Sequence, residues 1–110
     1  PKQLFQYHPA DTNDNVVYTS PDVATTFTIF ETMDICNTDS VLHLVRVYIV
    51  PATEHAAIKY AIIYDVTVPA LSTISWAGPQ TLEQDMDIAV RADLASKVTF
   101  TGSGKVLSAS

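Results

Sequence analysis

The sequence alternates between segments rich in Val, Ile, Thr, Phe and Tyr and short breaks made of Pro, Asn, Asp and Gly. β-branched and aromatic residues favour extended backbone, whereas the residues of the breaks favour turns. No window repeats apolar residues at helical spacing over three turns. The pattern predicts an all-β chain. Its expected strands span 3–7, 16–19, 24–35, 41–50, 57–68, 72–76, 86–92, 97–101 and 105–107.

The clearest alternation of apolar and polar side chains lies in 57–68. Successive side chains of a strand point to opposite faces of the sheet, so alternate residues share a face. One face carries Lys59, Asp65 and Thr67. The other face is apolar and is predicted to lie against the core. Its members are Ile58, Tyr60, Ile62, Tyr64, Val66 and Val68.

The segment 41–50 is apolar on both of its faces. Val45, Val47 and Ile49 form the stripe that is expected to face the core. The opposite stripe is Leu42, Leu44, Arg46 and Tyr48. A strand with two apolar faces is expected to be covered on both sides. We therefore expect the three apolar members of the second stripe to lie in an interface with other copies of the chain.

The last third of the chain repeats the inward and outward alternation. Met86, Ile88, Val90 and Ala92 share one face of 86–92, and Val98 and Phe100 are expected to supply the next inward pair. These positions are predicted members of the core.

Turn residues mark where the strands end. Pro51 and Pro69 lack a backbone N–H and restrict the residue before them, so each should end a strand. Residues 37–40 and 102–104 combine Asn, Asp, Ser and Gly and are expected to be turns. A chain of 110 residues can bury one modest core. We expect one domain, 1–110, folded as an antiparallel β-sandwich or jelly-roll-like barrel.

The stretch DTNDNVVYTS, residues 11–20, begins with the spacing of a calcium loop. Such a loop needs Gly at its sixth position and a bidentate Glu at its twelfth. Those positions hold Val16, which resists positive φ, and Asp22, which is one methylene shorter than Glu. Asp, Asn and Thr also close turns by bonding their own backbone. We therefore predict a turn, with no metal and no other cofactor.

The sequence offers no motif for metal or nucleophilic catalysis. His8, His43 and His55 form no metal-binding pair on one element, although ligands from separate strands can converge in a fold. His43 is expected at the margin of the core. Cys36 lies between Asp34 and Asp39, and acidic neighbours disfavour the thiolate that a nucleophile needs. We expect a packing role for this cysteine.

An acid and base pair could be imagined from Glu83 with Asp85 or Asp87. An exposed acidic turn is the expectation, because nothing apolar in the surrounding sequence would give the two carboxyl groups different roles. The chain is expected not to be an enzyme.

Trp76 raises the question of a sugar-binding module, since sugars stack on exposed aromatic rings. Ala, Gly and Pro79 follow it, which is typical of a strand end. Aromatic residues are common in cores and interfaces, so we expect Trp76 to pack in one of these. An exposed platform for a glycan is the alternative.

Composition limits the partners. Hydrophobic residues make up 47% of the chain and charged residues only 16%, which favours a protein that buries surface against others. The net charge of −6 leaves no basic patch for nucleic acid. The first residues resemble neither a signal peptide nor a membrane span. We therefore expect synthesis in a cytoplasm and no membrane partner.

Several segments, taken in order, resemble those of small virion structural proteins of tailed bacteriophages. VVYTSPD at 16–22 is similar to their Y-T-A-P-D-like corner, CNTDS at 36–40 to a V-T-N-T-like turn, and VRVYIVP at 45–51 to a V-x-V-Y-L-V-P-like strand. TLEQDMDIAVRA at 81–92, followed by KVTFTGSG at 97–104, continues the resemblance over most of the chain.

Two segments depart from that pattern. Residues 52–56 stand where those proteins have a Gly-rich loop, and 83–85 stand where they have a Pro-Gly-Asp turn. Both departures fall in connections between expected strands.

The resemblance implies a capsid decoration or cement protein without a catalytic residue. Such a protein would be made in the cytoplasm of the host bacterium and would lie on the outer capsid surface, in contact with the major capsid protein or other virion proteins. Because decoration proteins often sit at three-fold positions of an icosahedral shell, the resemblance also implies a homotrimer. The interface residues expected for this role are Leu42, Leu44, Tyr48 and Trp76. A neck, tail or fibre component and a carbohydrate- or receptor-binding module are the alternatives.

Overall fold

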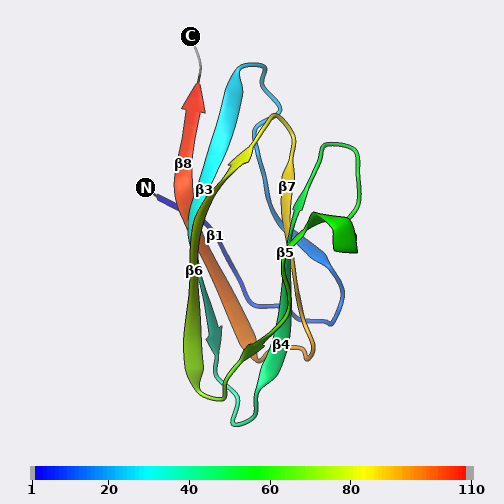
Figure 1. The fold of residues 1–110 in the computed structure, drawn as a ribbon, viewed down its shortest axis with the longest axis vertical. Coiled ribbons are helices and arrows are strands. Elements are labelled where there is room, and N and C mark those ends of the chain that lie inside the picture. The colour runs from blue at the N-terminus through cyan, green and yellow to red at the C-terminus, as the bar shows by residue number, and fades with distance from the viewer. Residues whose placement is uncertain (1, 109–110) are drawn as a thin grey trace.

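A computed structural model describes residues 2–108 (Figure 1). Within this range there are eight strands and a single 3₁₀ turn, η1 (Ile58–Tyr60). The strands are β1 (Lys2–Tyr7), β2 (Asn15–Thr19), β3 (Thr26–Asn37), β4 (His43–Val50), β5 (Ala61–Val68), β6 (Ser72–Leu82), β7 (Asp87–Ala92) and β8 (Val98–Ser108). Pro51 and Pro69 directly follow β4 and β5, which confirms that proline ends both strands.

The strands form two antiparallel four-stranded sheets, in the orders β1-β8-β3-β6 and β2-β7-β4-β5. The pairs β1–β8, β2–β7, β3–β6 and β4–β5 are those of one long hairpin whose tip is the β4–β5 connection. Folding this doubled hairpin over one core adds the pairings β3–β8 and β4–β7. The result is a jelly-roll β-sandwich, which confirms the predicted fold class.

The core lies between the two sheets. Its largest fully buried side chains are Phe30, Phe100, Met33, Ile35, Leu82 and Ile88. The predicted inward positions Val45, Val47, Val90 and Val98 are also fully buried, which confirms the period-2 pattern in β4, β7 and the start of β8. Burying a large apolar side chain stabilises a fold by roughly 1.5–3 kcal/mol, so these residues are a main source of stability.

The predicted strand 57–68 is wrong at its start and in the middle of its core face. Its first part is η1, and Ile58 is 71% exposed. In β5 the register slips between Val45↔Val66 and Val47↔Ile63, a β-bulge in which Asp65 adopts a φ of 50°. The bulge reverses the alternation in the middle of the strand, so Ile63 faces the core while Tyr64 and Val66 are 40% and 41% exposed. Beyond the bulge, Val68 is fully buried in the core, as predicted.

The turn predicted at Gly102-Ser103-Gly104 is absent, because β8 runs through it as one strand. A Cβ at Gly104 would collide with the backbone carbonyl of Ile29 on β3, and one at Gly102 would collide with the ring of Phe5. Glycine stands here because a strand and an aromatic ring approach closely. The two strands expected at 97–101 and 105–107 are therefore a single strand.

Trp76 does not mark a strand end, since β6 continues through Pro79 to Leu82. β6 is an edge strand, where a proline without an N–H is tolerated. The indole is half-buried and packs on Phe30, with ring centroids 5.1 Å apart. Trp76 therefore packs against the core, and its part in an interface stays a prediction.

Tyr48 is covered by its own chain. It forms a small cluster with Val50 and Ala89 on the outer face of the sheet β2-β7-β4-β5. Ala56 and Tyr60, from the connection between β4 and β5, pack over this cluster, and Tyr48 is only 2% exposed. The outer face of β4 is indeed covered at this point, but the expected contact of Tyr48 with another chain has to be corrected.

Gly104→Ala should lower the free energy of unfolding by roughly 1–3 kcal/mol, because its new methyl group meets a backbone carbonyl that cannot rotate away. Gly78→Ala is the matched control, since its methyl group would lie 3.7 Å from Trp76 Cζ2, an ordinary contact. Urea unfolding of both variants measures the difference. Equal destabilisation by the two changes would contradict the close approach of β8 to β3.

Candidate functional site

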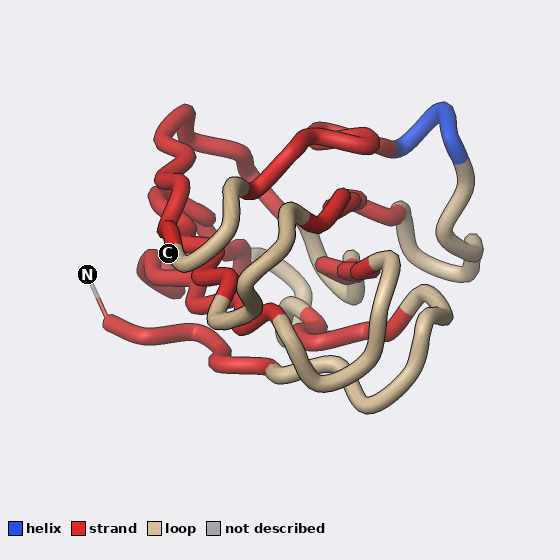
Figure 2. Tube along the Cα trace, turned by 90° about the horizontal axis from the view of Figure 1, so that it is seen from below, coloured by secondary structure: helices blue, strands red, loops and turns tan. Residues whose placement is uncertain are grey.

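Four connections meet at the lower end of the sandwich in Figure 1: 8–14, 38–42, 69–71 and 93–97. We call this the loop end. Figure 2 views the molecule from below, where the connections cross the ends of the strands. Backbone hydrogen bonds tie them together: Leu71 N–H donates to Asp39 (3.0 Å), Thr38 to Lys97 (3.0 Å) and Ser96 to Pro9 (2.7 Å). The loop end is therefore one cross-linked surface.

Asn37 fixes the connection between β3 and β4. Its Nδ2 donates to the carbonyls of Val41 (2.9 Å), Val68 (3.1 Å) and Pro69 (3.2 Å). Its Oδ1 accepts from Asp39 N–H at 2.9 Å. The sequence indicated a turn here, but not that one buried amide would join two connections.

His43 joins the connection 38–42 to the connection 93–97. The residue is only 3% exposed. Nε2 lies 2.8 Å from Asp39 Oδ2 and Nδ1 lies 2.7 Å from Asp93 Oδ1. Carboxylates only accept hydrogen bonds, so a ring that bonds both of them carries a proton on each nitrogen. We call His43, Asp39 and Asp93 the histidine clamp.

The charges of the clamp support one another. The hydrogen bond to Asp39, followed by that to Asp93, raises the pKa of His43 above its ordinary value, although burial opposes this. The hydrogen bond from His43 and then that from Ser40 N–H lower the pKa of Asp39. His43 was expected at the margin of the core, and its two carboxylate partners became apparent only in the fold.

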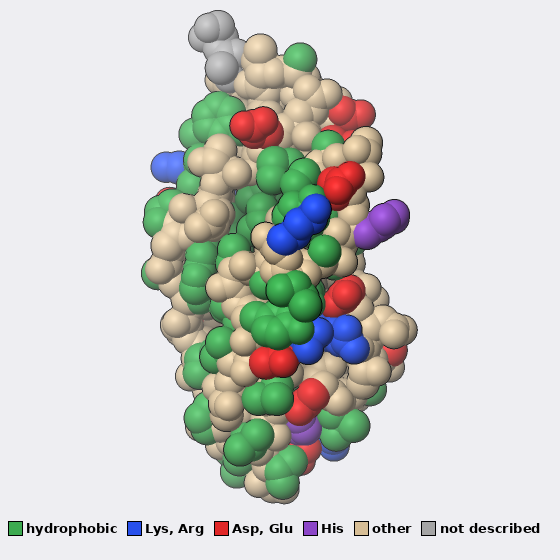
Figure 3. All heavy atoms as spheres, turned by 45° about the vertical axis from the view of Figure 1, so that its right-hand side comes forward, with side chains coloured by type: hydrophobic (Ala, Val, Ile, Leu, Met, Phe, Trp, Pro, Cys, Tyr) green, Lys and Arg blue, Asp and Glu red, His purple; other side chains and the backbone are tan. Residues whose placement is uncertain are grey.

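Exposed apolar side chains lie on three connections of the loop end, two held by the clamp and one bonded to Asp39. We define the end patch as Val41, Leu42, Leu71 and Leu94. Leu71 is 73% exposed and Leu42 is 56% exposed, and Figure 3 shows hydrophobic side chains gathered at this end. Exposed apolar side chains held together on a rigid surface are typical of an interaction site. Of the four, only Leu42 was predicted as an interface residue.

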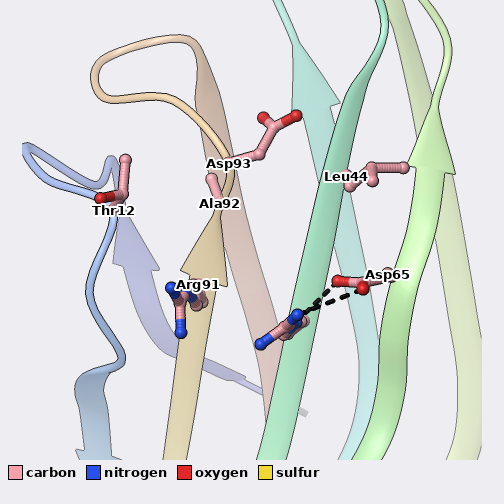
Figure 4. Close-up of a pocket in the computed structure, with 7 residues that line it drawn as sticks. Thr12, Leu44, Asp65, Arg91, Ala92 and Asp93 are labelled. Carbon is pink, nitrogen blue, oxygen red and sulfur yellow. Dashed lines mark hydrogen bonds and ion pairs between the residues drawn. The ribbon is translucent and has the colours of Figure 1, made fainter.

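A pocket of about 350 Å³ opens on the outer face of the sheet β2-β7-β4-β5, beside the loop end (Figure 4). Arg46 on β4 and Arg91 on β7 lie directly opposite each other in the strand register. Thr12, Leu44, Asp65 and Asp93 line the remaining sides. Leu44 was predicted in an interface and here forms a half-buried wall. We call this the arginine pocket.

The two arginines differ in how they are neutralised. Arg46 donates from Nε (2.6 Å) and Nη2 (3.2 Å) to the two oxygens of Asp65, which is the first cause of its raised pKa. Its guanidinium also lies 4.2 Å from the ring centroid of Tyr64. Arg91 pairs with Asp14 at 3.9 Å, and its charge adds to the hydrogen bond from Arg46 in lowering the pKa of Asp65, but its guanidinium makes no hydrogen bond to another residue of 2–108. Arg91 thus keeps open donors.

The stretch that resembled a calcium loop is a turn, as predicted. Asp11 Oδ1 accepts hydrogen bonds from Asn13 N–H at 3.0 Å and from Asn15 Nδ2 at 2.9 Å. These bonds, the one from Asn15 first, lower the pKa of Asp11. The carboxylate is therefore engaged in closing its own turn.

The other candidate residues do not assemble into a site. His8 bonds Thr99 at 3.0 Å, and His55 lies in the β4–β5 connection at the opposite end from His43. Cys36 is half-buried and has no disulfide partner among residues 2–108. Asp87 accepts a hydrogen bond from Thr19 at 2.7 Å. Within the described range, no three His, Cys, Asp or Glu side chains are arranged to hold a metal ion.

The 3₁₀ turn η1 is far too short to cross a membrane, and residues 2–108 contain no longer helix.

Comparison with known proteins identifies the fold. No protein-family model matches the chain, and no curated protein matches it. It is similar to a chain in the structure of infectious bursal disease virus, Gx strain, with 13% identity and a TM-score of 0.50 over 96% of this chain and 29% of that one. A chain in the structure of the Gt strain gives 9% identity and a TM-score of 0.41, over 92% and 27%.

The protein thus belongs to the class of jelly-roll β-sandwiches. The chain spans less than a third of the length of the solved chains that it resembles. At 13% identity the likeness is one of fold, and it transfers no residue of a site.

The histidine clamp should make stability depend on pH. A raised His43 pKa contributes stability that is complete below the ordinary value of 6.5 and is lost as pH rises through the folded value. A lowered Asp39 pKa contributes stability that is present above 3.8 and is lost as pH falls. Between these limits the clamp is at full strength. Wild type should therefore lose unfolding free energy from about pH 6 to about pH 9, and His43→Gln should lose less.

Urea unfolding at the two pH values measures this difference. An identical pH dependence in wild type and His43→Gln would rule out the clamp as its source.

Proposed function

We propose that this chain is a structural protein of a virus particle, and more specifically a capsid decoration or cement protein of a tailed bacteriophage. It would act by contact alone, without a catalytic step. Jelly rolls are common in viral capsid proteins, and a chain of a virus structure has this fold over nearly the whole of this chain. Fold alone does not define function, so the proposal depends on what the surface offers.

The end patch is the observation that carries the proposal. It places four exposed apolar side chains on connections that hydrogen bonds and the histidine clamp hold in place. A rigid apolar surface loses little conformational entropy on association, so the free energy gained by burying it is not offset by the cost of ordering side chains and loops. We propose that the end patch joins copies of this chain around a three-fold axis, with Leu42 and Leu71 in the contact. Closed symmetry would then cover the patch completely.

The acidic charge favours a place outside the shell. With a net charge of −6, contact with packaged nucleic acid would be repulsive. The major capsid protein, or another virion protein, is the proposed partner of the trimer. A neck, tail or fibre component could use the same fold and the same patch, and the number of copies per particle separates these roles.

Leu42→Asp should convert a trimer into a monomer, because three buried carboxylates would meet without partners at the three-fold contact. Ile58→Asp is the matched control, since Ile58 is 71% exposed at the opposite end of the sandwich. Light scattering with size exclusion gives the mass of each variant. A wild-type monomer, or a trimer that survives Leu42→Asp, would refute the end patch as the trimer contact.

Added to particles that lack it, the protein should bind in a fixed number related to the number of capsomers and should raise the temperature at which the particles rupture. Many weak contacts on one shell add restraint without new chemistry. Binding should resist moderate salt, since only 16% of the residues are charged and surface ion pairs are screened.

Quantitative mass spectrometry of the particles and a heat challenge measure both effects. The Leu42→Asp variant should protect less than Ile58→Asp does. A few copies per particle would favour the neck or tail role, and absence from virions would end the structural proposal.

A further inference from the structure

We propose that the arginine pocket binds an acidic sugar, with the carboxylate of the sugar on Arg91. This goes beyond the proposed structural role and does not depend on it. A particle protein that also binds glycans would combine shell contact at one surface with attachment to glycans at another.

The first argument is the placement of the arginines. Arg46 and Arg91 are the only two in the chain, and the register of β4 and β7 sets them directly opposite each other. Like charges in directly opposed positions destabilise an antiparallel pair. The chain has twelve Asp and Glu residues against six Lys and Arg residues, so an acidic residue opposite either arginine would have been a readily available way to avoid this repulsion. Asp65 on Arg46 offsets part of this repulsion, and an anion on Arg91 would offset what remains.

The second argument is that one arginine is free to bind. Asp65 takes both donor positions that Arg46 directs toward it, at 2.6 and 3.2 Å. Arg91 has Asp14 at 3.9 Å and only a longer-range electrostatic contact with Asp65, and its side chain is 40% exposed. A guanidinium with open donors pairs with a carboxylate through two parallel hydrogen bonds. Arg91 is therefore the anchor for the anionic group.

The third argument concerns the rest of the ligand. Asp65 and Asp93 place carboxylate oxygens around the pocket, Thr12 adds a hydroxyl group, and Leu44 forms an apolar side (Figure 4). These carboxylate oxygens accept hydrogen bonds, so they favour a ligand with many hydroxyl groups. Their negative charge repels a doubly charged phosphate. A volume of about 350 Å³ lies at the lower end of the range for small-molecule pockets. A single sugar ring that carries a carboxylate matches this chemistry.

The pocket is also held in shape before any ligand arrives. Arg46 holds Asp65 on one side, and His43 holds Asp93 at 2.7 Å on the other. Acceptors that are already fixed cost little entropy when a ligand binds. This differs from a platform at Trp76, whose ring is engaged with Phe30.

Calorimetric titration of the intact chain tests the proposal, with N-acetylneuraminic acid and glucuronic acid as probes. At least one of them should bind at least about tenfold more tightly than glucose, acetate or inorganic phosphate. Tighter binding of phosphate or acetate would overturn the proposal in favour of a simple anion site. Equal binding of glucose, or no binding of either acid, would also overturn it.

Arg91→Gln should abolish this binding, and Arg91→Lys should weaken it, because lysine lacks the planar pair of donors. Lys105→Gln is the matched control for the loss of one positive charge, since Lys105 is exposed on β8 in the other sheet. Equal loss in Arg91→Gln and Lys105→Gln would refute the pocket.

Stability provides an independent readout for the same variants. Arg91→Gln removes a like charge opposite Arg46, so it should unfold at the same or a higher urea concentration than wild type. Loss of binding together with loss of folding would show that Arg91 is structural, against the proposal.

Discussion

The pairing of β3 with β8 is the interaction on which the rest of this structure depends. It runs from Thr26↔Ser108 to Asn37↔Val98 and closes the doubled hairpin into a sandwich. Without it, β1 and β8 would have no sheet to join and Phe30 would lose one wall of its packing. The pairing is possible because glycine at 102 and 104 lets a strand and a ring come close. The two glycines therefore allow the main core to form. This core matters because the protein has few charged residues whose interactions could add stability.

The bulge at Asp65 connects the fold with its surface chemistry. By reversing the alternation of β5, it turns Ile63 inward and leaves Tyr64 exposed. The same bulge places the Asp65 carboxylate on Arg46, and the Arg46 guanidinium lies over Tyr64. One inserted residue thus shapes a wall of the arginine pocket. Bulges re-aim side chains in this way and often lie next to binding sites.

The loop end gathers unlike features in one rigid region. Asp39 and Asp93 reach His43 from two different connections, and exposed leucines lie on these connections and on the one that Asp39 bonds. The clamp keeps the apolar side chains in fixed positions, and its Asp93 also borders the arginine pocket. The proposed assembly surface, the end patch, and the proposed ligand site, the arginine pocket, are therefore both held in place by the histidine clamp.

The sequence by itself located most of the strands, but not the start of β5, the full length of β6 or the continuity of β8. It also determined that proline ends β4 and β5, that Val45, Val47, Val90 and Val98 face inward, and that Asp11 closes a turn. These features depend on residues close together in the chain, so local propensity and a period of two suffice to predict them. Only the tertiary structure decided that His43 meets Asp93, that Arg46 faces Arg91, and that Asp65 bulges out of β5. Those partners are set by the register between strands that are far apart in sequence. Since one slipped residue exchanges the two faces of a strand, register follows from packing the whole core and cannot be deduced from any single segment.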